Sequence, residues 1–211
     1  MIIIKYMNIP QKLKNKQRRI GLTGGIACGK STITNYIREY KNIPIIDADN
    51  LSREVTKPNT YGYKKILDYF GNQIIDNKNN SEKLINRKLL KKIIFNNPES
   101  KEWIERLLHP LVKEKMIEKC SQHENNQTIL LVIPLLFEAK FADICTEIWL
   151  VKCPKELQKK RLIKRDKICE NEANKIINLQ LSFEEKRKLS DVILDNSEDQ
   201  NKWINTIRKL I

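Results

Sequence analysis

The feature that most constrains this chain is a short glycine-rich segment, GGIACGKS, at residues 24–31. It fits the pattern G-x-x-x-x-G-K-[ST], and it lies between an apolar run at 20–23 and a segment of helical period at 30–40. Glycines at such a place let a loop wrap an anion with its own amides, and the phosphates then lie at the positive end of the following helix. The segment therefore predicts a nucleoside-triphosphate site.

The residue types in this loop have separate expected roles. Lys30 would neutralise the β- and γ-phosphates of the nucleotide, and the Ser31 hydroxyl would ligate Mg²⁺. The loop around them would bind the nucleotide, and the other residues expected to take part are Gly24, Gly25, Ala27, Cys28, Gly29 and Thr32.

The rest of the chain alternates short apolar runs with longer segments of helical period. Strands are predicted at 20–23, 43–47, 128–133, 147–151 and 192–194, with helices at 30–40, 155–164, 172–180 and 199–210. Such alternation implies right-handed crossovers and an α/β fold, in which a parallel sheet is covered on both faces.

The segment from residue 51 to about 120 has helical period and no convincing strand. Helices are predicted there at 63–70, 84–95 and 101–120, the last interrupted at His109-Pro110. We interpret this block as an insert packed beside the sheet. Residues 1–17 show no period and are predicted to form a flexible basic arm.

Membrane and secreted proteins are disfavoured. The longest unbroken apolar stretch, Ile129–Phe137, is far shorter than the ~20 residues that a membrane span needs. The five cysteines are odd in number and form no C-x-x-C pair, which disfavours a disulfide framework or a zinc site. We expect free thiols and a cytoplasmic location.

The formal net charge of +14 raises the alternative of a nucleic-acid-binding NTPase. However, lysines outnumber arginines about threefold and are spread along the chain, as on solvated surfaces. We therefore expect no stable nucleic-acid partner and an anionic small-molecule substrate.

Two further pairs of residues suggest phosphoryl-transfer chemistry. Asp47 and Asp49 follow the strand predicted at 43–47, where ligands bind an open parallel sheet, and one could accept a proton from an acceptor hydroxyl. The alternative is that they cap the next helix. Arg161 and Arg165 lie four residues apart on one predicted helix face and could clamp phosphate oxygens; the alternative is a solvated face beside Asp166.

With these residues in place, the chain resembles the dephospho-CoA kinases from Arg19 to about Asn196. The loop alone is generic, but the ordered set of motifs is quite specific to that family. The matching segments are IGLTGGIACGKST (20–32), IDAD (46–49), IFNNP (94–98), LLHPLV (107–112), PLLFE (134–138), KRLIKRD (160–166) and DVILDNS (191–197).

The resemblance implies an ATP-dependent small-molecule kinase that phosphorylates an alcohol group. It implies a three-layer P-loop kinase fold with a parallel sheet, a helical CoA-binding insert at about 51–122 and a lid at about 155–180. Asp49 would be the base on the ribose 3′-hydroxyl of dephospho-CoA, Lys30 and Arg161 would stabilise the transferring phosphoryl group, and Arg165 would belong to the same lid.

The resemblance also implies an acceptor site. The residues expected there, besides Asp49, are Thr23, Phe95, Lys101, His109, Leu136 and Glu138. Glu138 could instead begin a surface helix, and His109-Pro110 could merely kink one. Separately, Asn196 near the last strand is a candidate contact to the nucleotide base.

The sequence departs from the family pattern at few positions. Ala27 and Cys28 stand where glycine and serine are usual, and Val132 stands where many relatives carry an aspartate. Without that carboxylate, Mg²⁺ binding would rely more on Ser31 and the phosphates, and Asp47 could compensate. A P-loop kinase for another nucleoside or nucleotide remains an alternative. We expect a monomer or a weak homo-oligomer.

Overall fold

The computed structural model describes residues 17–76, 83–123 and 128–211, so the predicted arm lies outside the described residues except for Gln17. The chain divides into two compact units. The first unit comprises the described residues up to Ile46 together with Gln122–Ile211, and the second comprises Asp47–Ser121.

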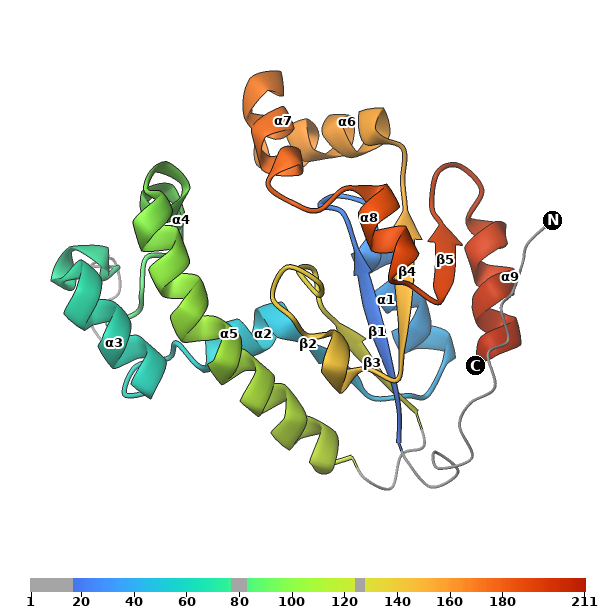
Figure 1. Cartoon of the computed structure of the whole chain (residues 1–211), viewed down its shortest axis with the longest axis horizontal. Helices are drawn as coiled ribbons and strands as arrows, with labels where there is room; N and C mark the ends of the chain where they lie inside the picture. The colour runs from blue at the N-terminus through green and yellow to red at the C-terminus, as the bar shows by residue number, and fades with distance from the viewer. Residues whose placement is uncertain (1–16, 77–82, 124–127) are drawn as a thin grey trace. The chain divides into compact units, whose positions relative to one another are not determined.

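The first unit is built on a parallel five-stranded sheet with strand order β2-β3-β1-β4-β5 (Figure 1). The strands are β1 (Arg18–Gly24), β2 (Ile45–Asp47), β3 (Thr128–Val132), β4 (Glu147–Lys152) and β5 (Val192–Asp195). β1 lies between β3 and β4, with Ile20 opposite Leu130 and Leu22 opposite Trp149. The predicted parallel sheet is confirmed, and the loop after β1 leaves the middle of its carboxyl edge.

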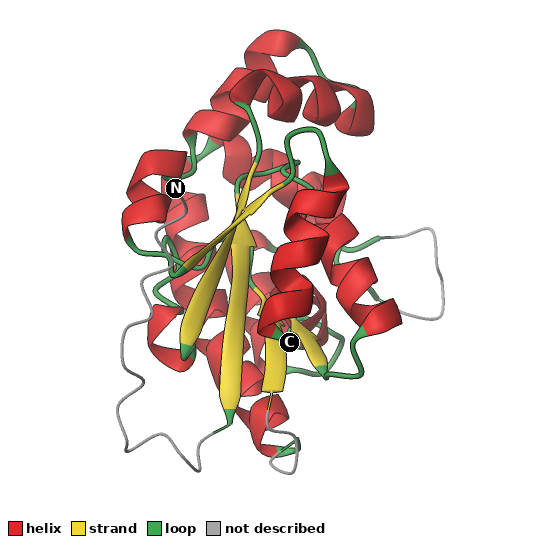
Figure 2. Ribbon diagram, turned by 90° about the vertical axis from the view of Figure 1, so that its right-hand side faces the viewer, coloured by secondary structure: helices red, strands yellow, loops and turns green. Residues whose placement is uncertain are grey.

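Helices α1 (Lys30–Tyr40) and α9 (Gln200–Leu210) cover one face of this sheet. The C-terminal helix lies against the strands in Figure 2. Ile33 and Ile37 of α1 and Trp203 and Ile207 of α9 share one core with alternate strand residues, because successive side chains of a strand point to opposite faces. On the opposite face, Gly21 leaves room for other side chains, those of Leu136 and Cys145.

Three helices follow β4, namely α6 (Lys155–Asp166), α7 (Glu170–Asn178) and α8 (Phe183–Lys188). The helix predicted at 172–180 begins and ends two residues earlier. Its earlier start is explained by Glu172, which accepts a hydrogen bond from the Cys169 amide. α8 was not predicted. Its capping box, in which Ser182 and Glu185 bind each other's backbone amides, is written in the sequence as S-x-x-E.

The second unit is helical, as predicted for most of its length. Its helices are α2 (Ala48–Glu54), α3 (Tyr61–Phe70), the 3-10 helix η2 (Asn72–Ile74), α4 (Arg87–Asn96) and α5 (Pro98–Ser121). The predicted interruption at Pro110 is wrong, because α5 is continuous through it. Proline costs one backbone hydrogen bond, but Ile104 and Val112 are buried on either side of it, and this packing holds the helix together.

None of the helices within the described residues combines the length and apolar character that crossing a bilayer requires.

Candidate functional site

The glycine-rich loop connects β1 to α1 and has the backbone of an anion-binding turn. Gly24 has φ of 154°, and a side chain there would meet the Val151 carbonyl oxygen at 2.9 Å. Gly29 is left-handed, with φ of 95°, immediately before α1. The loop therefore places the first backbone amides of α1 at the carboxyl edge of the sheet. These amides have no hydrogen-bond partner within the helix.

Lys30 lies across this loop. Its Nζ atom donates hydrogen bonds to the carbonyl oxygens of Gly24 at 2.8 Å and Gly25 at 3.0 Å. A cation held beside the first amides of α1 suits the β- and γ-phosphates of a nucleotide. Ser31 follows in the first turn of α1, and Thr32 donates its amide to the Gly29 carbonyl oxygen.

Ala27 adopts a left-handed conformation, with φ of 59°. A Cβ atom in this conformation costs roughly 1–2 kcal/mol, which explains why glycine suits this position. We expect Ala27→Gly to raise the free energy of unfolding by about 1 kcal/mol, measured by urea denaturation without nucleotide. The same substitution at Ala173, which is buried inside α7, should lower it by a similar amount. A destabilised Ala27→Gly would contradict the loop conformation.

Three carboxamide side chains hold the loop, and sequence reasoning missed two of them. Gln158 of α6 donates to the Ile26 carbonyl oxygen at 2.9 Å, and Gln180 accepts from the Ile26 amide at 2.7 Å. Asn196, at the end of β5, is buried and donates to the Cys28 carbonyl oxygen at 2.9 Å. The observed contact of Asn196 is thus with the loop, and its contact to the nucleotide base stays a prediction.

The close approach of two of these carboxamide side chains to the loop also explains why glycine is needed at positions 25 and 29. A Cβ atom on Gly25 would lie 2.1 Å from Gln158 Nε2, and one on Gly29 would lie 2.1 Å from Asn196 Nδ2. Any larger residue at either position would push the anchoring amide away from the loop.

The structure separates the two arginines of α6. Arg161 lies beside the loop: its Nη1 atom donates to the Cys153 sulfur at 3.5 Å and is 3.7 Å from the Cβ position of Gly29. Arg165 binds its neighbour Asp166 instead, at 2.7 Å, and its side chain is mostly exposed. The predicted clamp on phosphate is therefore better served by Arg161.

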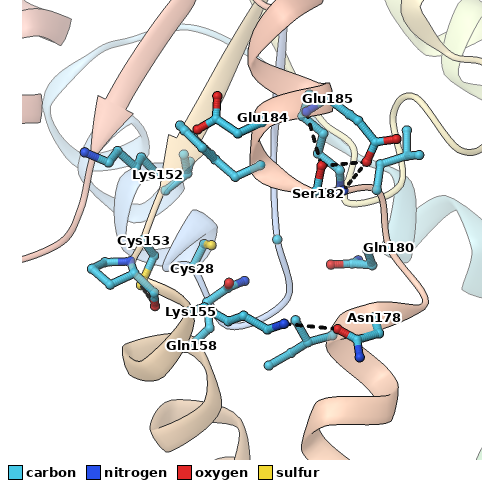
Figure 3. Close-up of a pocket in the computed structure, with 17 residues that line it drawn as sticks. Cys28, Lys152, Cys153, Lys155, Gln158, Asn178, Gln180, Ser182, Glu184 and Glu185 are labelled. Atoms are coloured by element: carbon cyan, nitrogen blue, oxygen red, sulfur yellow. Dashed lines mark hydrogen bonds between the residues drawn. The ribbon is translucent and has the colours of Figure 1, made fainter.

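A pocket of about 610 Å³ opens beside the loop in the first unit (Figure 3). Its wall combines loop residues with the end of β4, the start of α6 and the segment 177–186. The lining residues include Gly25, Cys28, Cys153, Gln158 and Lys186. Lys155 Nζ reaches Asn178 Oδ1 at 3.2 Å and so joins α6 to α7 across it. Such a pocket is large enough for part of a nucleotide.

Three predicted acceptor residues also belong to the first unit. Thr23 is buried, and its hydroxyl donates to the Pro134 carbonyl oxygen at 3.3 Å. Leu136 is fully buried and packs over Gly21, so its observed role is in the core.

Glu138 makes an ion pair with the buried Lys186 at 2.8 Å and accepts a hydrogen bond from the Leu181 amide at 3.0 Å. It therefore connects α8, and the residues that lead into α8, to the sheet. Its Oε2 atom is buried and has no hydrogen-bond partner among the described residues, and its contact with an acceptor stays a prediction.

Within the second unit, Asp47 and Asp49 take different positions at the start of α2. Asp47 is the N-cap, and its Oδ1 atom accepts hydrogen bonds from the amides of Asp49 at 2.8 Å and Asn50 at 3.4 Å. The capping alternative therefore holds for Asp47. Asp49 lies in the first turn of the helix, so its carboxylate is not the cap.

The other three predicted acceptor residues lie on α4 and α5. Lys101 and His109 fall on one face of α5 with Glu105 between them, and Lys101 Nζ is 3.8 Å from Glu105 Oε1. Burial lowers the pKa of His109, against the opposing effect of the Glu105 carboxylate. Phe95 is 43 % exposed near the end of α4. The role of these three residues in binding an acceptor stays a prediction.

The sheet order, the loop after the central strand and the basic side chains beside it define a P-loop kinase. Residues 18–202 match the family model described as dephospho-CoA kinase. The chain belongs to that family.

The similar proteins agree with this assignment. A Prochlorococcus marinus (strain MIT 9312) protein named dephospho-CoA kinase is 81 % identical over 205 residues, which cover 97 % of this chain and 100 % of the relative. The structure of dephospho-CoA kinase from Campylobacter jejuni is 29 % identical with a TM-score of 0.65, covering 92 % of this chain and 98 % of that one. A Thermus thermophilus crystal structure is 25 % identical with a TM-score of 0.75, covering 92 % and 96 %.

Proposed function

We propose that this chain transfers the γ-phosphoryl group of ATP to the ribose 3′-hydroxyl of dephospho-CoA, which yields coenzyme A. The observation that carries the proposal is the phosphate loop with Lys30 across it, in a chain that matches the kinase family over residues 18–202. Family membership indicates dephospho-CoA as the acceptor, and the phosphate loop indicates a nucleoside triphosphate as the donor.

Each group of site residues has a separate role in this reaction. Lys30 and Arg161 bind the transferring phosphoryl group, whose negative charge spreads over its equatorial oxygens. Asp49 accepts the proton of the 3′-hydroxyl as the oxygen attacks phosphorus, and ADP leaves in line with the new bond. Phe95, Lys101, His109 and Glu138 bind and orient the acceptor. Gln158, Gln180 and Asn196 keep the loop in its binding conformation.

Magnesium fits the side chains present. The described residues contain no cluster of three or more histidine, cysteine, aspartate or glutamate side chains that could hold a metal ion alone. This suits Mg²⁺, which keeps several waters and binds through few protein ligands together with phosphates. Ser31 would supply a hydroxyl oxygen to the ion. When bound, Mg²⁺ neutralises charge on the β- and γ-phosphates.

The segment 155–180 would act as the lid. It carries Arg161 and two of the three carboxamide side chains that hold the loop, those of Gln158 and Gln180. Closing a lid over the donor excludes water and so limits hydrolysis of ATP. The second unit would be the CoA-binding insert. We also infer a cytoplasmic enzyme, monomeric or weakly self-associating, without a stable nucleic-acid partner. None of its five cysteines, all of which lie within the described residues, forms a disulfide.

An acceptor panel tests the proposal against its alternatives. Release of ADP from MgATP should depend on dephospho-CoA and remain at background with adenosine, AMP or pantetheine. Faster release with one of those acceptors would keep the kinase and replace the substrate. Release stimulated by single-stranded DNA or RNA, and weakened by salt, would instead favour the nucleic-acid-dependent NTPase.

A further inference from the structure

Two cysteines that lie far apart in the sequence meet at the wall of the pocket beside the phosphate loop. Cys28 belongs to the loop and Cys153 follows β4; both lie in one buried core cluster, where a hydrogen bond links their thiols. Figure 3 shows both side chains among the residues that line the pocket. Their exposed fractions are only 3 % and 7 %, so a small molecule would have to reach them through this pocket, whose lining includes both.

The charged groups around this pair favour a thiolate at Cys153. The hydrogen bond from Cys28 and the Arg161 guanidinium lower the pKa of Cys153 to about 7, although burial and the Asp195 carboxylate oppose them. The same hydrogen bond, together with burial, raises the pKa of Cys28, against the effect of Lys30. The Cys153 sulfur lies 3.7 Å from the Pro154 carbonyl oxygen, to which the thiol donates when it is protonated. The two pKa values move in opposite directions, so Cys153 is the more readily ionised thiol of the pair.

We propose that Cys153 is a site of oxidation by hydroperoxides and that Cys28 is its resolving partner, so that a disulfide forms against the phosphate loop. The Cys153 thiolate attacks the terminal oxygen of the hydroperoxide. A sulfur–oxygen bond forms, the O–O bond breaks, and the alkoxide or hydroxide leaves and takes a proton from water. The product is a sulfenic acid on Cys153.

Oxidation of Cys153 then activates Cys28. The thiolate that accepted the Cys28 hydrogen bond, and whose charge also raised the pKa of Cys28, is gone, and the Lys30 ammonium remains to favour the Cys28 thiolate. Cys28 attacks the Cys153 sulfur, a disulfide forms, and the hydroxyl leaves as water with the Cys28 proton. Overall, two thiols and one hydroperoxide give one disulfide, one alcohol (or water) and one water.

The disulfide would disable the nucleotide site. A sulfur–sulfur bond is shorter than a hydrogen bond between the same atoms, so closure draws Cys28 towards β4. The Cys28 carbonyl oxygen is bound to Asn196, and the left-handed Gly29 follows directly, so the shift changes the direction of the amides that face phosphate. Closure also removes the thiolate that Arg161 binds. This inference concerns nucleotide binding and does not depend on the acceptor.

The test treats the full-length chain with tert-butyl hydroperoxide and measures two quantities. Peptide mass mapping locates disulfides, and calorimetry measures the Kd for MgADP before and after oxidation and again after dithiothreitol. We expect a Cys28–Cys153 disulfide, a loss of MgADP affinity of at least about tenfold, and recovery on reduction. Cys153→Ser should show no such loss relative to its own untreated Kd. Cys145→Ser, which alters a half-buried cysteine of the same unit, should respond as the wild type does.

A second readout separates chemistry from folding. The rate of Cys153 alkylation by iodoacetamide should reach half its plateau near pH 7 in the wild type. Cys28→Ala, which removes the donor, should shift that midpoint upward by about one pH unit, whereas Cys28→Ser should keep it low because a hydroxyl still donates. A disulfide between other cysteines, no disulfide, unchanged MgADP affinity after oxidation, or an unshifted Cys28→Ala midpoint would each overturn the proposal.

Discussion

Asp49→Asn is expected to lower kcat by about 10²–10⁴-fold, the usual contribution of a general base, while the Kd for ATP changes little. The amide has nearly the same shape as the carboxylate but cannot accept the proton of the acceptor hydroxyl. Asp49 lies in the first turn of α2 and is not the helix cap, so the substitution should leave the helix intact. Initial rates of ADP release at saturating dephospho-CoA, with separate nucleotide titrations, measure both quantities.

Asp47→Asn is the matched control, because it removes the same charge two residues away. Asparagine caps helices as well as aspartate does, so α2 should persist and the loss of kcat should be far smaller. If Asp49→Asn retained near-normal turnover, or if Asp47→Asn were the more damaging of the two, the assignment of the base to Asp49 would be wrong.

Lys30→Ala is expected to weaken binding and catalysis together. Loss of a charged donor to phosphate should raise the Kd for ATP about tenfold, and loss of charge neutralisation in the transition state should lower kcat by a further 10²–10³-fold, roughly. Both effects arise at the same atom, the Lys30 Nζ that lies over the Gly24 and Gly25 carbonyl oxygens. Calorimetric titration with nucleotide and steady-state kinetics distinguish the two parts.

Lys41→Ala provides the comparison. Lys41 is at the opposite end of α1, where its ammonium binds the carbonyl oxygen of the last residue, Ile211. Removing its charge should cost little more than a modest loss of stability, with kinetic constants near those of the wild type. Equal kinetic damage from both variants would mean that Lys30 acts through folding rather than through the phosphates.

The phosphate loop was predictable because its chemistry is local. A strand, four loop residues between glycines, a lysine and a hydroxyl must follow one another along the chain to build an anion site, so the sequence carries the whole pattern. The parallel sheet was predictable for a related reason. Its strands are continuous apolar runs separated by segments of helical period, and few topologies satisfy that alternation.

The contacts that hold the loop were not predictable from local patterns. Gln158 and Ile26 are separated by 132 positions, and Gln180 and Ile26 by 154, so only the folded chain brings them together. The ion pair between Glu138 and the buried Lys186 has the same origin. Pro110 shows that a local pattern can also mislead. A proline normally breaks a helix, but tertiary packing along α5 outweighs that tendency here.

The central claim is the transfer of a phosphoryl group to one particular hydroxyl of dephospho-CoA. The most direct measurement is the structure of the product formed with MgATP, by mass spectrometry and phosphorus–proton NMR. The account predicts one new phosphomonoester, on the ribose 3′-oxygen, formed in equal amount with ADP and absent from reactions with Asp49→Asn over the same time. A phosphate on any other oxygen, or ADP formed without a phosphorylated acceptor, would contradict it.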